Sequence, residues 1–192
     1  MPLLPTRNYS DSAAANILLE VKKGDKKALG EFIWQHQERF YCIAFIATMD
    51  PEAASQLTIS AFKDACATIR TMSAKQLSSH GNVWEWLSDF IVDAIAQYHG
   101  DNSPPPGGNP QTDPTADGSA NMDWETTVIL GTQRVKRCIN SLSAEQKQTF
   151  VLRHQLGLNL NQVVAVLNQN PDNVMAALHR ARVQVVKCLG RG

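Results

Sequence analysis

The 192-residue sequence is short of charge: only 19% of its residues are charged, and the formal net charge is zero. It also lacks any run approaching the roughly 18 consecutive apolar residues of a membrane-spanning helix. The amino terminus has no basic segment followed by an apolar stretch, which excludes a secretory signal at that end. We therefore expect a cytoplasmic protein without membrane insertion. Hydrophobic residues at 43% exclude disorder throughout and provide enough apolar material for a core.

Cysteine is scarce, and its spacing is uninformative. The four cysteines, Cys42, Cys66, Cys138 and Cys188, are far apart, with no C-x-x-C pair and no nearby histidine at zinc-ligand spacing. This pattern predicts reduced thiols in the core and no metal site.

Catalytic sequence patterns are also missing, because the chain has no Gly-rich phosphate loop, no G-x-S-x-G and no H-E-x-x-H. His36 and His154 lie within helical patterns, where a lone histidine is usually structural. Asp89 and Asp93 share a helix face at i, i+4, and a solvated acidic face explains that spacing more simply than acid–base chemistry. We expect a protein that is not an enzyme and needs no cofactor.

The charges are distributed unevenly along the chain. Residues 1–102 hold nine Lys or Arg against twelve Asp or Glu, residues 103–123 hold none against three, and residues 124–192 hold nine against three. The basic carboxyl-terminal third, at +6, is typical of a surface that attracts phosphate, and equally of a well-solvated surface.

Residues 101–123 are rich in Pro, Gly, Ser, Asn and Asp and nearly devoid of apolar side chains. Such a stretch cannot bury enough surface to offset its ordering entropy, so we expect a disordered linker. The linker divides the chain into one domain at residues 1–100 and a second at 124–192. Neither shows the period-two alternation of a strand, and the expected fold class is all-α.

Capping residues and apolar stripes predict the helices of both domains. Asp25 and the Asp50-Pro51-Glu52 sequence are expected to begin long helices, and Ser143 to Gln146 form a capping box. The predicted helices span residues 12–22, 26–48, 51–70, 82–99, 124–140, 144–156, 160–167 and 171–189. A short helix, a turn at residues 168–170 and a longer helix make a helix-turn-helix, whose second helix can enter a DNA major groove.

A family resemblance follows from these residues taken together: Gly24-Asp25, Asp50 to Ala54, Trp86-Leu87, Leu142 to Gln146, Arg153, Gly157-Leu158 and Leu178 to Arg182. The chain resembles the extracytoplasmic-function (ECF) sigma factors of RNA polymerase, as a divergent member. The resemblance implies a region 2-like first domain with a polymerase-binding helix and a promoter-melting helix. It implies a region 4-like second domain that reads upstream promoter DNA.

The resemblance assigns two sets of site residues. The polymerase-binding positions are Ser55, Gln56, Ile59 and Ser60. The DNA-binding positions are Asn173, Ala176, His179, Arg180 and Arg182.

Several of these surfaces depart from the family pattern. Uncharged side chains replace the usual acids on the polymerase-binding helix, so charge complementarity to a basic partner is largely lost. In the melting helix, Asp89, Val92 and Asp93 replace basic and amide side chains, and carboxylates repel phosphate. Trp84 and Trp86 are candidates either for stacking on an extruded base or for core and partner contacts.

The expected recognition helix is poor in base-reading donors, since it carries Asp172, Met175, Ala176 and Ala177. Asn173 can pair with adenine, although capping and solvent contact also suit its position near the helix start. His179, Arg180 and Arg182 are available for phosphate, and a solvated helix face explains them equally well.

Two hypotheses follow. The first is a divergent sigma factor that binds core RNA polymerase and duplex DNA, with weak DNA binding through phosphate contacts. The alternative is a sigma mimic, a protein-interaction module that binds an anti-sigma factor or another regulator without reading DNA.

Overall fold

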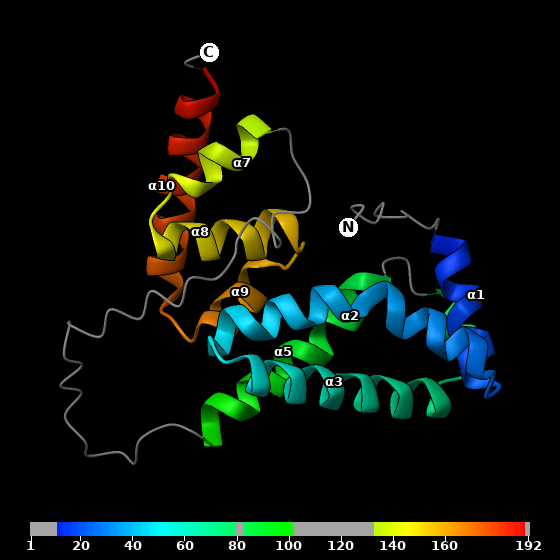
Figure 1. The fold of residues 1–192 in the computed structure, drawn as a ribbon. Helices are drawn as coiled ribbons and strands as arrows, with labels where there is room; N and C mark the ends of the chain where they lie inside the picture. Colours follow the sequence, from blue (N-terminus) through cyan, green and yellow to red (C-terminus); the bar gives the residue numbers. More distant parts are fainter. Residues whose placement is uncertain (1–10, 80–82, 102–132, 191–192) are drawn as a thin grey trace.

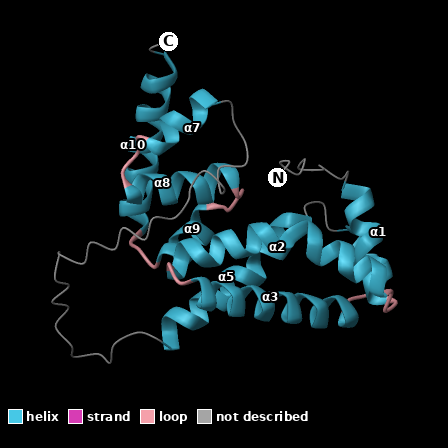
Figure 2. Ribbon diagram, in the orientation of Figure 1, coloured by secondary structure: helices cyan, strands magenta, loops and turns pink. Residues whose placement is uncertain are grey.

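The computed structural model describes residues 11–79, 83–101 and 133–190, and within these ranges every regular element is helical (Figures 1 and 2). The predicted all-α fold is confirmed. The helices are α1 (Asp11–Lys22), α2 (Lys26–Thr48), α3 (Pro51–Thr71), α4 (Ala74–Ser79), α5 (Val83–Asp101), α7 (Gln133–Asn140), α8 (Ala144–Phe150), α9 (Leu160–Leu167) and α10 (Pro171–Gly190), with a π-helical turn, η1 (Val151–Gln155), directly after α8.

Side-chain caps begin most of the helices where the sequence predicts them. Asp25 accepts hydrogen bonds from the backbone N–H groups of Lys27 and Ala28, and Asp50 does the same for α3, where Pro51 occupies the first turn. The Ser143–Gln146 capping box is present at α8. These caps satisfy N–H groups that have no partner inside the helix, and so they fix where each helix starts.

Helices α1, α2, α3 and α5 pack into one bundle. Its largest fully buried side chains include Phe32, Phe40, Ile43, Ile69 and Leu87. Phe62 stacks against Phe40 with ring centroids 4.7 Å apart, which joins α3 to α2. Tight apolar packing of this kind gives α3 one buried side and leaves its opposite side to solvent.

Helices α7 to α10 form a second group beyond one end of α2, and α9 lies where the two groups meet (Figure 1). Leu152, Leu158, Val163, Val166 and Val174 are all fully buried there. The buried residues of both groups belong to one continuous apolar cluster. The two groups are therefore packed together in this structure.

The helices differ from the predictions in several places. The short helix α4 was not expected, and α5 continues through Gly100 to Asp101. The helix predicted at residues 144–156 is α-helical only to Phe150 and continues as the π-helical turn η1. The rest of the predicted linker lies outside the described residues, as does the predicted helix at 124–140 before Gln133. No helix in the described ranges has the length and apolar content to cross a membrane.

The prediction of four reduced cysteines is wrong for one pair. Cys138 and Cys188 form a disulfide with their Cα atoms 5.7 Å apart, whereas Cys42 and Cys66 are free. Fifty residues separate the bonded cysteines, and no short spacing signals the pair in the sequence.

Candidate functional site

The predicted helix-turn-helix is present. Asn159 and Gln162 form a capping box at the start of α9, and Asn168 ends that helix in the left-handed region at φ 48°. Asn170 then accepts a hydrogen bond of 2.8 Å from the backbone N–H of Asp172, which starts α10. The helix after this turn, α10, is the longest of the carboxyl-terminal group and lies at the outer edge of that group (Figure 1).

The structure exposes every predicted DNA-binding position on α10: Asn173, Ala176, His179, Arg180 and Arg182. Met175 is also exposed, at 47%. Ala177, by contrast, is fully buried, so its inclusion on the recognition surface is wrong. Val174 and Leu178 are buried on the same side, because this side of α10 packs against the other helices of its group.

Two of the exposed arginines have neighbours that affect their availability. Arg180 lies 3.9 Å from the Glu145 carboxylate, with both side chains about half exposed, and such a pair is worth little in water. Arg182 Nε donates to His154 Nε2 at 3.1 Å. Burial first, and then Arg182 and Arg153, lower the pKa of His154, so at neutral pH its ring is neutral and can accept this bond.

The predicted polymerase-binding positions Ser55, Gln56, Ile59 and Ser60 all lie on the exposed side of α3. Ile59 is the one large apolar side chain among them, and it is 55% exposed. The Ser55 hydroxyl donates to the Pro51 carbonyl within the same helix. An exposed isoleucine among small neutral side chains is suited to apolar contact with a partner.

The junction between the two helix groups contains an Arg–Trp clamp, formed by Arg39 of α2 and Trp84 of α5. Both side chains donate to the Leu156 carbonyl oxygen, at 2.9 Å from Arg39 Nη2 and 3.0 Å from Trp84 Nε1. The Arg39 guanidinium carbon lies 3.6 Å from the centre of the Trp84 ring, a cation–π contact. Burial lowers the pKa of Arg39 to about 10, so the group remains charged at neutral pH.

Gly157 lies beside the Arg–Trp clamp, and its backbone conformation rather than lack of space favours glycine there. Its φ of +75° is a conformation that other residues rarely adopt. A Cβ built there would lie 3.4 Å from Arg39 Nη2 and 3.5 Å from Trp84 Nε1.

Gln162 makes a second connection across the junction, and it is only 6% exposed. Its Oε1 accepts from the Asn159 backbone N–H, which completes the α9 cap. Its Nε2 donates to Ser88 Oγ at 2.9 Å and to Asp89 Oδ1 at 2.7 Å, both on α5. One side chain therefore caps the first helix of the helix-turn-helix and attaches it to α5.

These contacts cover part of the helix that the resemblance assigns to promoter melting. Trp84 is engaged by Arg39 and Leu156, so its ring cannot stack on a base in this arrangement. Trp86 packs edge-on against Phe90 at 5.1 Å. Val92 is buried at 8% exposure, so this side chain, which stands where the family places a basic or amide residue, is not part of the exposed surface of α5.

Sequence reasoning missed the junction residues Arg39 and Gln162. The signal for Gln162 is its position three residues after Asn159, which marks a capping box but not the bonds of its amide nitrogen to α5. Arg39 had no signal, because its partner carbonyl is 117 positions away. Across the described residues, no group of three or more His, Cys, Asp or Glu side chains is placed to hold a metal ion.

Comparison with known proteins matches one family, and the similar solved structures include CnrH and RpoE. The family described as Sigma-70, region 4 matches residues 132–185. CnrH, solved in complex with the cytosolic domain of CnrY, is 13% identical, with 93% of this chain and 97% of that chain covered and a TM-score of 0.48. The sigma factor RpoE from Bartonella quintana, solved with the anti-sigma factor NepR, is 13% identical, with 86% and 98% covered and a TM-score of 0.44.

Comparison with curated protein sequences finds no match. The matched family segment runs from the residue before α7 into the last turns of α10, and it includes the whole helix-turn-helix. Residues 132–185 are therefore similar to sigma-70 region 4, and this match supports the predicted resemblance to sigma factors over that segment.

Proposed function

We propose that this protein is a divergent, sigma-factor-like transcription initiation protein of the cytoplasm, which binds RNA polymerase and promoter DNA and catalyses no reaction itself. The observation that carries the proposal is the match of residues 132–185 to sigma-70 region 4, together with the exposure of Arg180 and Arg182 on the second helix of its helix-turn-helix. DNA contact is mainly through phosphate, because the exposed start of α10 offers Met175 and Ala176 rather than base-reading donors.

The proposed polymerase contact is the exposed side of α3, around Ile59. Without acidic side chains at positions 55, 56, 59 and 60, apolar burial rather than electrostatic steering must supply the affinity. This contact is consequently weaker than one with complementary charges.

Replacing Ile59 with Asp tests this contact. We expect the substitution to abolish recovery of core RNA polymerase from native lysate by the tagged full chain, with an unchanged helical circular dichroism signal. Ala67→Asp, which adds the same charge to another exposed position of α3, is the matched control and should preserve recovery. Equal recovery with Ile59→Asp would remove this side of α3 from the interface.

The sigma mimic is the second candidate, and the junction favours it. Ser88 and Asp89 of α5 are occupied by Gln162, and Trp84 is occupied by Arg39, so the melting helix is not free to meet DNA in this arrangement. Recovery of a small regulator in place of polymerase, with no DNA binding even at low salt, would establish the mimic.

A further inference from the structure

The Cys138–Cys188 disulfide joins the first and last described helices of the region 4 domain. Cys138 lies in α7 and Cys188 near the end of α10. The cross-link encloses α8, α9 and most of α10, and so it spans the complete helix-turn-helix.

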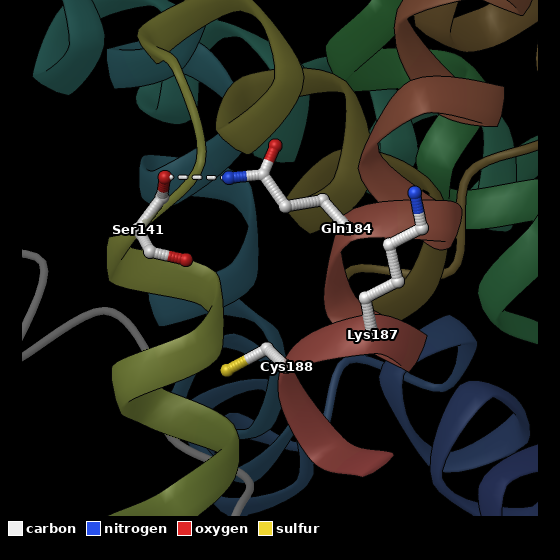
Figure 3. Close-up of a pocket in the computed structure, with 4 residues that line it drawn as sticks. All are labelled: Ser141, Gln184, Lys187 and Cys188. Carbon is white, nitrogen blue, oxygen red and sulfur yellow. Dashed lines mark hydrogen bonds between the residues drawn. The ribbon is translucent and has the colours of Figure 1, made fainter. Parts of the chain in front are cut away.

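The two sulfur-bearing residues differ in their access to solvent. Cys138 is only 1% exposed, whereas Cys188 is half-buried and lines an open cavity of about 480 Å³. Ser141, Gln184 and Lys187 line the same cavity, and Figure 3 shows Cys188 on α10 with its sulfur directed toward the neighbouring helix. The approach from solvent is therefore more open on the side of Cys188 than on that of Cys138.

We propose that this disulfide is a thiol–disulfide exchange site for small thiols and dithiols, which attack at Cys188. The thiolate of the reductant forms a new S–S bond to Cys188 Sγ, and the bond to Cys138 breaks, with Cys138 leaving as a thiolate that takes up a proton. The second thiol of a dithiol then attacks its own sulfur in the mixed disulfide and releases Cys188. The dithiol is oxidised to a disulfide, and the protein gains two thiols.

Lys187 is exposed and lines the same cavity, and Figure 3 shows its side chain directed away from the Cys188 sulfur, so its charge gives a general attraction for an anionic thiolate and no direct contact with the disulfide. The two free cysteines, Cys42 and Cys66, do not compete with the small thiol as attacking groups. Burial, and secondarily Glu38, raise the pKa of the Cys42 thiol to about 11, and burial raises the pKa of Cys66.

Reduction of the Cys138–Cys188 disulfide removes a covalent cross-link, and we expect the domain to remain folded. The buried Ile139 side chain and the hydrogen bond from Gln184 Nε2 to the Ser141 carbonyl, at 2.9 Å, still hold the end of α7 to the domain. A disulfide that closes a loop of this length stabilises the folded protein mainly by lowering the conformational entropy of the unfolded chain. We expect its reduction to lower the melting temperature by about 10 °C.

The test follows the mixed disulfide in the folded full chain. A short pulse of glutathione at neutral pH is followed by iodoacetamide and peptide mass spectrometry. We expect glutathione on Cys188 and the alkyl group on Cys138 in at least about tenfold excess over the reverse arrangement, which is the selectivity that different access predicts. Glutathione placed equally on both cysteines, or preferentially on Cys138, would overturn the proposal.

A second measurement separates exchange in the folded state from reduction after unfolding. The rate of disulfide loss should rise in proportion to dithiothreitol concentration, well below the melting temperature. A rate that is independent of dithiothreitol and equal to the global unfolding rate would mean an inaccessible structural cross-link.

Discussion

His36 is a residue whose surroundings make the stability of the protein depend on pH. Its ring lies between Phe32 and Trp84, with centroids 5.5 and 5.9 Å away, and its Nδ1 is buried without a hydrogen-bond partner among the described residues. Burial, and then the nearby Arg39 charge, lower its pKa from 6.5 to about 4. Between these two pKa values the unfolded chain binds a proton at His36 and the folded chain does not.

Acidification should therefore destabilise the folded state. We expect the free energy of unfolding to fall by about 2 kcal/mol between pH 7 and pH 5 on account of His36. Urea titrations of the wild type and of His36→Gln at both pH values measure this difference. If both proteins lose the same stability on acidification, His36 is not the group responsible.

Gly157 combines a positive φ with a position beside the two side chains of the Arg–Trp clamp. Replacing it with Ala places a Cβ in the left-handed region and against the two donors, so we expect a loss of about 1–2 kcal/mol in the free energy of unfolding. Gly30→Ala is the matched control. Nothing lies within 4 Å of a Cβ at that helical position, and the substitution should stabilise α2 by up to about 1 kcal/mol. Chemical denaturation tests both, and an unchanged Gly157→Ala protein would contradict the strain expected from a side chain at this positive φ.

At the scale of the element, α10 has a basic exposed side that lacks base-reading donors. We expect the full chain to bind unrelated duplexes alike, with a dissociation constant on the order of 10⁻⁴ to 10⁻⁶ M at physiological salt. Replacing Arg180 and Arg182 with Ala should weaken binding equally on every sequence and lower the logarithmic salt slope by about 0.9 per lost phosphate contact.

Fluorescence-anisotropy titrations at several salt concentrations measure this DNA binding. Lys26→Ala with Lys27→Ala removes the same charge from the start of α2 and should leave the slope unchanged. Tight, sequence-selective binding that survives the arginine substitutions would restore an ordinary promoter-reading role.

The elements themselves could be predicted mainly from residues that act locally. Asp25, Asp50 and the Ser143–Gln146 box determine where helices begin through bonds within four positions, and a sequence displays such spacings directly. The buried sides of Val92 and Ala177 could not be predicted in the same way. Each of these helices packs against more than one neighbouring helix, which widens its buried face. The apolar stripe in the sequence of one helix does not reveal that width.

At the scale of the whole molecule, Gln162 is the side chain whose chemistry holds the two helix groups together. Replacing it with Glu keeps an oxygen for the Asn159 N–H, but it removes the donor to Ser88 and Asp89 and adds a carboxylate beside Asp89. We expect the free energy of unfolding to fall by about 2–3 kcal/mol and the groups to separate.

Small-angle scattering should then give a larger radius of gyration, and the amides of α5 should exchange hydrogen faster. Gln146→Glu makes the same change in the capping box of α8, away from the junction, and should preserve the wild-type radius. An unchanged radius in Gln162→Glu would mean that the Arg–Trp clamp is sufficient alone.

The relation between the halves is the part of the fold that the sequence did not predict. The separate stripes on either side of residues 101–123 led us to expect independent folding of the two domains, which remains a prediction. The clamp and Gln162 join residues 72 to 117 positions apart, and the disulfide joins residues 50 apart. Contacts this distant leave no local pattern, and these side chains are also common at surfaces, so only the folded chain identifies them.

The Trp84 indole also has an optical consequence. Its ring faces the guanidinium of Arg39 in the same helix group, and its N–H is bonded to a carbonyl of the other helix group. That hydrogen bond ends when the groups separate. The emission of an indole depends on the charge and water around it, so the protein contains its own fluorophore at the junction. Replacing Trp34, Trp86 and Trp124 with Phe leaves Trp84 as the single tryptophan of the chain, and it removes the background of the 54% exposed Trp34 on α2. Opening and closing can then be followed by emission wavelength in unlabelled protein, on the time scale of mixing with DNA or polymerase.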